Sequence, residues 1–60
     1  MDPRRRQELA AMRYLADKYP ETTRIRFEGY TIILEELIYI LGWRVKHTFK
    51  FRSKNEIISN

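Results

Sequence analysis

The sequence predicts a small α+β protein in which two helices pack on one face of a short sheet. Three observations favour this class: an N-terminal helix with clear end signals, two segments with strict two-residue alternation, and an amphipathic apolar segment between them. The predicted order is α-β-α-β, in a single domain over residues 1–60. Such an order favours parallel strands joined by a right-handed crossover.

The first element is a predicted helix over residues 3–19. Asp2 is a favourable N-cap, and Pro3 suits the first helical position, where its missing N–H costs nothing. Pro20 ends the helix because proline disfavours the α region at the residue before it. One face carries apolar residues at spacings of three and four: Leu9, Met12, Ala16 and Tyr19.

Three consecutive cations, Arg4, Arg5 and Arg6, occupy the first turn of this helix. Cations are unfavourable at the positive end of the helix dipole, at a cost of about 0.3–1 kcal/mol each. Two interpretations stay open. Either the cluster is simply solvated, or it is kept for contact with a phosphate or carboxylate group.

Two segments alternate as strands, at residues 23–28 and 43–52. The second reads Trp-Arg-Val-Lys-His-Thr-Phe-Lys-Phe-Arg. Because successive strand side chains point to opposite faces, one face is expected to be apolar and aromatic and the other cationic. His47 falls with the apolar set, which favours a core or interface histidine over a ligand or catalytic base.

Residues 30–41 are ambiguous by composition and are predicted to form a helix. As a strand, one face would bury Glu35 and the other Glu36, whereas a helix places both on its polar arc. Burying a lone carboxylate costs several kcal/mol, while β-branched helix positions cost tenths each. Gly42 suits the left-handed position that ends such a helix. Residues 53–60 form a tail in which Ser53 and Glu56 have capping-box spacing.

Composition excludes several kinds of site. The chain has no cysteine and one histidine, which excludes a disulfide framework, a thiolate zinc site and a histidine cluster. The adjacent Glu35 and Glu36 diverge on a helix and cannot chelate one metal. No cofactor and no enzymatic activity are expected, since the sequence shows no nucleophile–base pair and no Gly-rich loop.

The expected surroundings of the protein follow from the same composition. No run reaches the ~18 consecutive apolar residues of a membrane span, so no membrane partner is expected. The lack of cysteine is compatible with a reducing cytoplasm, and a cytoplasmic location is expected.

The predicted function is nucleic-acid binding, with duplex DNA favoured, by a small accessory or regulatory protein. The net charge is +4, and the open face of the predicted sheet, helped by the first helical turn, collects cations that would attract phosphates. The predicted contact residues are Arg24, Arg26, Arg44, Lys46, Lys50, Arg52, Arg4, Arg5 and Arg6. The alternative is a protein-interaction module whose basic face docks an acidic surface of a partner protein, for example as an inhibitor.

Self-association is the expected reinforcement of so short a chain. A domain of this size buries only about 60% of the surface that its unfolded chain exposes, and a two-stranded sheet is poor on its own. Pairing two copies through residues 43–52 would give a four-stranded sheet and cover an exposed edge. Trp43, Phe49 and Phe51 are the expected core or dimer anchors of this homodimer.

Overall fold

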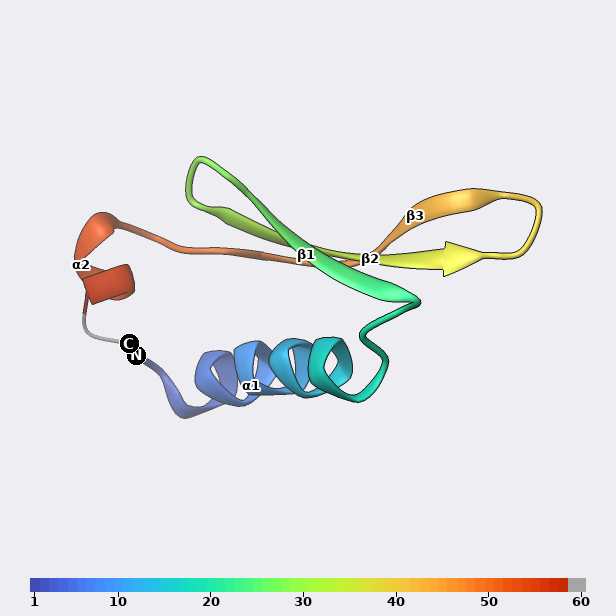
Figure 1. Cartoon of the computed structure of the whole chain (residues 1–60). Coiled ribbons are helices and arrows are strands. Elements are labelled where there is room, and N and C mark those ends of the chain that lie inside the picture. Colours follow the sequence, from blue (N-terminus) through green and yellow to red (C-terminus); the bar gives the residue numbers. More distant parts are fainter. Residues whose placement is uncertain (59–60) are drawn as a thin grey trace.

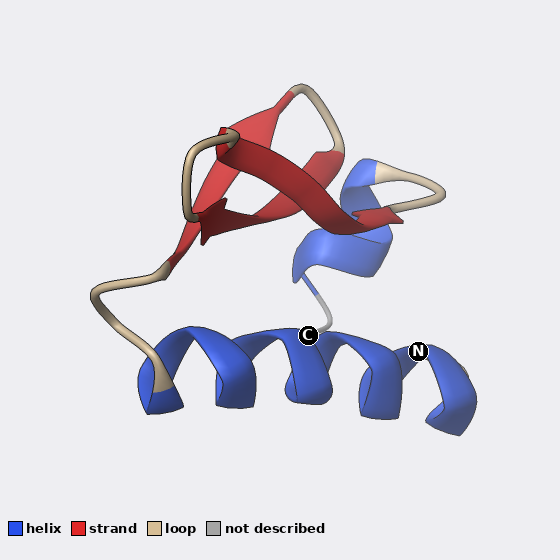
Figure 2. Cartoon of the chain, turned by 90° about the vertical axis from the view of Figure 1, so that its right-hand side faces the viewer, coloured by secondary structure: helices blue, strands red, loops and turns tan. Residues whose placement is uncertain are grey.

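The computed structural model describes residues 1–58, which fold in the order α-β-β-β-α. The elements are α1 (Pro3–Lys18), β1 (Thr23–Glu28), β2 (Thr31–Ile38), β3 (Gly42–Lys50) and α2 (Lys54–Ile58). The strands form one antiparallel sheet in the order β1-β2-β3. The long helix α1 lies along one face of this sheet, and the short helix α2 lies beyond the end of β3 (Figures 1 and 2).

Local signals at both ends explain α1. The Asp2 carboxylate caps the helix by accepting a hydrogen bond from the Arg4 backbone N–H at 2.8 Å. The helix ends at Lys18, one residue before the predicted end, and Tyr19 is its C-cap. The buried Thr23 hydroxyl then donates to the Tyr19 carbonyl, which fixes the connection from α1 into β1.

The predicted helix over residues 30–41 is wrong, because Thr31–Ile38 forms the central strand β2. The prediction assumed that a buried glutamate would have no partner. Glu35 is indeed 7% exposed, but it accepts from Arg24 Nε at 2.9 Å and lies 3.3 Å from Arg26 Nε. Since its charge is paired and hydrogen-bonded, the penalty for a lone buried carboxylate does not apply.

The remaining predictions about topology change with β2. The α-β-α-β order, the pair of helices on one sheet face and the parallel crossover are all wrong, because two hairpins join three antiparallel strands. Gly29 lies in the β1–β2 connection and Gly42 is the first residue of β3, with φ of +61° and +81°, values that favour glycine. The third strand comes from the same chain, so the sheet no longer needs a second copy to exceed two strands.

A β-bulge divides β3 into two parts, and odd-numbered side chains point to opposite faces of the sheet on either side of it. Leu34 lies opposite His47, but the next residue, Glu35, lies opposite Val45, so that Lys46 is the extra residue. Phe49 and His47 therefore face α1, whereas Val45 shares the other face with Glu35. The predicted division of residues 43–52 into one aromatic and one cationic face is wrong, because alternation does not continue through the bulge.

The core lies between α1 and the inner face of the sheet. Its buried members come from α1, β2 and the last part of the 43–52 segment: Leu9, Met12, Ile32, Leu34, Phe49 and Phe51. Phe49 and Phe51 meet edge to face, with ring centroids 5.1 Å apart. The β2–β3 hairpin projects well past the C-terminal end of α1, so this core does not extend to its tip (Figure 1).

Candidate nucleic-acid interface

Cations from both ends of the sequence meet at one end of the molecule. The first turn of α1, the end of β3 and α2 lie together there (Figure 1). We name this surface the basic end and define it by five exposed cations: Arg4, Arg6, Lys50, Arg52 and Lys54. Within residues 1–58, none of these five side chains forms a salt bridge. Their charges are therefore available to an external anion.

The partly buried side chain of Arg5 connects the elements that form the basic end. Its guanidinium donates to both carboxylate oxygens of Glu56, at 2.9 and 2.7 Å, and to the Lys50 carbonyl at 2.7 Å. The same guanidinium lies 4.5 Å from the centroid of the Phe49 ring. This bidentate contact, which we call the clasp, ties α1 to α2 and to the end of β3.

The clasp is ionised on both sides at neutral pH. The hydrogen bond to Glu56 raises the pKa of Arg5 above its ordinary value. The hydrogen bond from Arg5, followed by that from the Arg52 backbone N–H, lowers the pKa of Glu56 from 4.5 to about 2. Arg5 was predicted as a contact residue, but in the structure its guanidinium is bonded to Glu56, whereas its neighbours Arg4 and Arg6 are exposed.

The basic end carries the whole charge excess of the protein. Residues 1–6 and 50–58 contain six cations and two acids, while residues 7–49 contain six of each, and the last two residues are uncharged. The net charge of +4 therefore belongs to the two chain ends, which the clasp brings together. Such a concentration of one sign creates a local positive potential that favours anionic partners.

The other predicted contact residues do not gather on one sheet face. Arg24 and Arg26 pair with Glu35, and Arg26 also donates to Glu28 at 3.0 Å. The Arg24 guanidinium stacks on Trp43, 4.1 Å from the ring centroid. On the sheet face away from α1, these two arginines are therefore paired with carboxylates of β1 and β2.

The bulge places the cations of the projecting hairpin elsewhere. Arg44 lies opposite Glu36, on the face that continues toward α1, and its guanidinium donates to the Trp43 carbonyl. Lys46 Nζ lies 2.6 Å from a Glu36 oxygen. Of the six predicted sheet cations, only Lys50 and Arg52 lie at the basic end.

The aromatic anchors and the histidine also have defined positions. Phe49 and Phe51 are buried in the core, and Trp43 is half-buried beneath Arg24. His47 is exposed, contrary to a core position, and its Nε2 lies 2.7 Å from a Glu8 oxygen on α1. The imidazole therefore links β3 to α1 at the surface.

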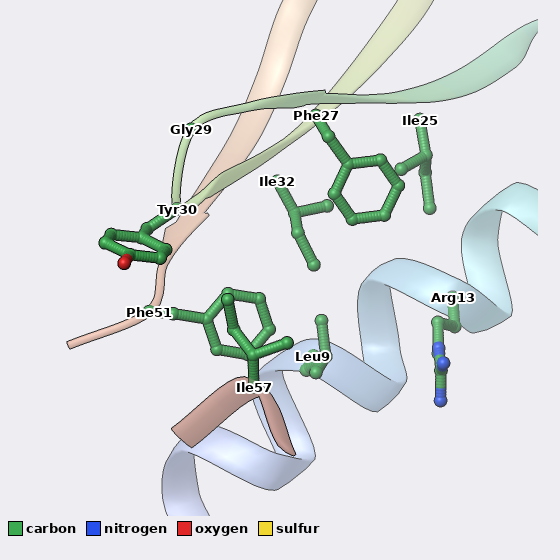
Figure 3. A pocket seen from close by; sticks show the side chains of 9 residues that line it. All are labelled: Leu9, Arg13, Ile25, Phe27, Gly29, Tyr30, Ile32, Phe51 and Ile57. Carbon is green, nitrogen blue, oxygen red and sulfur yellow. The ribbon is translucent and has the colours of Figure 1, made fainter. Parts of the chain in front are cut away.

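A groove of about 290 Å³ opens between α1, α2 and the β1–β2 connection (Figure 3). Seven of its nine lining residues are apolar or glycine, and Tyr30 and Arg13 are the polar ones. Phe27, Ile25 and Ile32 line its sheet side, with Leu9 facing them from α1 (Figure 3). This lining can accommodate an apolar side chain but brings no acid–base pair together.

Sequence reasoning missed Lys54 and the clasp. The capping-box spacing of Ser53 and Glu56 was a signal for a terminal helix, and the Glu56 backbone N–H does lie 3.4 Å from the Ser53 hydroxyl oxygen. That spacing contains no information about contact with Arg5, which is 51 residues away. The predicted tail 53–60 is helical over Lys54–Ile58, and residues 59–60 lie outside the described part of the chain.

Comparison with known protein families, curated proteins and solved structures gives no match to this chain. Among residues 1–58, no three histidine, cysteine or acidic side chains are grouped as metal ligands would be. The same residues contain no helix with the length and apolar character needed to span a membrane.

Proposed function

We propose that the protein is a non-enzymatic nucleic-acid-binding protein with an accessory or regulatory role, that duplex DNA is its favoured ligand, and that the basic end is its contact surface. The observation that supports this proposal is the location of the entire charge excess at that end. Five exposed cations, on α1, β3, α2 and the segment between β3 and α2, can each approach a phosphate, because none forms a salt bridge with a carboxylate within residues 1–58. Of the six sheet cations that the sequence predicted as contacts, only Lys50 and Arg52 belong to this surface.

The proposed contact is mainly with the phosphate backbone. Each phosphate that a cation neutralises releases condensed counterions, so affinity falls as salt rises. Five contacts correspond to a log–log salt slope of about −4.5. Phosphate contacts position a protein on the duplex without reading its sequence, so weak sequence preference is expected from this surface alone.

The experiment measures binding of a labelled duplex by fluorescence polarisation over a salt series. Two matched triple variants have the same net charge but lose their cations in different places. The first removes basic-end cations (Arg4→Gln, Arg6→Gln, Lys54→Gln), and the second removes exposed cations that form no salt bridge elsewhere (Arg13→Gln, Lys18→Gln, Arg44→Gln). The first variant should lose about 2.7 units of slope, and the second should keep the wild-type slope.

Two results would contradict the proposal. Equal losses in the two triple variants would show that net charge, and not the basic end, determines binding. No binding to duplex or single-stranded nucleic acid at low salt would end the proposal and favour the alternative, in which the same cations dock an acidic protein surface. Circular dichroism of all variants checks that the fold is retained.

A further inference from the structure

The tip of the β2–β3 hairpin is an exposed apolar projection. We define the hairpin tip as residues 37–43, an uncharged run that reads Leu-Ile-Tyr-Ile-Leu-Gly-Trp. Tyr39 and Ile40 are 90% and 87% exposed, and Leu37, Ile38 and Leu41 are also exposed. The tip lies at the opposite end of the molecule from α2 and the basic end (Figure 1), and the molecule is 39 Å long.

The tip is apolar on both of its faces and at its end. Leu37 lies opposite Trp43 on the face away from α1, and Ile38, the next residue, points to the other face. The residues of the turn extend from the end of the hairpin (Figure 1). A flat protein surface would cover only one side of such a convex projection. A medium that surrounds it, such as the interfacial region of a lipid bilayer, would cover all of it.

Ile40 is the least expected residue in the tip. Its φ is +74°, in the left-handed region that is a true outlier for a β-branched residue. Glycine or asparagine would adopt this conformation with less strain. Because the Ile40 side chain is almost fully exposed, the core gains nothing from it. A strained and exposed apolar side chain indicates a contact outside the folded chain.

The charges next to the tip suit an anionic surface. Arg44 follows it immediately, is exposed and forms no salt bridge within residues 1–58. The nearest acids are compensated, because Glu35 pairs with Arg24 and Arg26, and Glu36 pairs with Lys46. Tyr39 and Trp43 are residues enriched at membrane–water interfaces, where one end of the ring is apolar and the other is wet.

We propose that the hairpin tip inserts into the interfacial region of an anionic lipid bilayer. Two residues of each strand extend about 7 Å, which matches the ~5–10 Å depth that apolar faces reach at the headgroup boundary. No run in the sequence is long enough to span a membrane, but insertion at the surface needs no spanning segment. This proposal is independent of nucleic-acid binding, because the basic end faces away from the inserted tip.

Trp43 reports insertion directly, since it is the single tryptophan of the chain. The experiment adds phosphatidylcholine vesicles, with and without phosphatidylserine, to the full chain and follows tryptophan emission and co-sedimentation. A blue shift is expected with the anionic vesicles. Arg44, the one cation beside the tip that forms no salt bridge within residues 1–58, predicts binding roughly fivefold stronger than to the zwitterionic vesicles, and a shift that weakens with salt.

The decisive variant is Ile40→Asn, with Ile58→Asn as its matched control. Ile58 is also exposed but lies on α2, far from the tip. Ile40→Asn should weaken vesicle binding by about tenfold or more, yet unfold at higher denaturant because asparagine tolerates positive φ. Ile58→Asn should bind vesicles as the wild type does.

Three results would overturn the proposal: no emission shift with either vesicle, unchanged binding of Ile40→Asn, or a shift that sedimentation traces to self-association without lipid. The triple variant Arg4→Gln, Arg6→Gln, Lys54→Gln should retain the blue shift. If this variant lost vesicle binding, the basic end and not the tip would be the membrane-binding surface. A normal duplex titration alongside a failed vesicle titration would refute this inference while leaving the proposed function intact.

Discussion

Alanine replacements of Leu34 and Leu37 test whether residues 31–38 form a strand. In a helix, residues three apart lie on one face, so both leucines would be buried in the core. In β2 they lie on strand positions of opposite parity and point to opposite faces. Leu34 is 0% exposed and Leu37 is 43% exposed. The two substitutions are chemically identical, so the difference between them reports on the backbone.

The expected losses differ severalfold. Leu34→Ala deletes a fully buried side chain and should cost about 2–5 kcal/mol. Complete burial of a leucine contributes about 1.5–3 kcal/mol, so truncating the partly exposed Leu37 should cost roughly 1 kcal/mol. A chain of this size has a total stability of about 3–9 kcal/mol. Leu34→Ala therefore removes a large fraction of the free energy of unfolding.

The assay is urea unfolding, followed by far-UV circular dichroism and by Trp43 emission. With an m value near 1 kcal/mol/M, Leu34→Ala should lower the midpoint by about 2 M or more, or abolish the cooperative transition. Leu37→Ala should lower it by roughly 1 M. Equal losses, or a larger loss for Leu37→Ala, would place both side chains on one buried face and would refute the strand.

Three further predictions concern the clasp, the hairpin tip and the helix cap. Glu56 contributes fully to stability above its ordinary pKa of 4.5 and loses that contribution as pH falls through about 2; acid unfolding should show this dependence, and Glu56→Gln should abolish it. Ile40→Gly should raise the free energy of unfolding by about 1 kcal/mol, since relief of strain exceeds the added chain entropy; a lower urea midpoint would refute this. Asp2→Ala should cost about 0.5–2 kcal/mol and reduce helical content, because it removes the α1 cap.

The clasp links the fold of this protein to its proposed contact surface. Arg5 and Glu56 come from opposite ends of the chain, and their contact holds α1 beside α2. Arg5→Gln should therefore weaken duplex binding more than the loss of one phosphate contact would, because it separates Arg4 and Arg6 from Lys54. Repeating the salt series with Arg5→Gln tests this, and a loss no greater than that of Arg4→Gln would contradict it.

The sequence by itself contains the signals for α1, β1 and most of β3. Those signals are local: Asp2 and Pro20 mark the ends of the helical segment, and two-residue alternation marks both strands. The signal from Gly29 and Gly42 is equally local, since a backbone position with positive φ favours glycine wherever it occurs. Elements of this kind can be predicted from residues that lie a few positions apart in the sequence.

Only the tertiary structure decided the state of residues 30–41 and the position of the charges. Glu35 is acceptable inside a strand because Arg24 and Arg26, on the neighbouring strand, pair with it. The bulge at Lys46 changes which side chains share a face of the sheet, and no residue of that segment predicts the bulge. The basic end exists because Arg5 meets Glu56 across 51 residues. The effect of a charge depends on its partners in space, and a linear pattern does not contain that pairing.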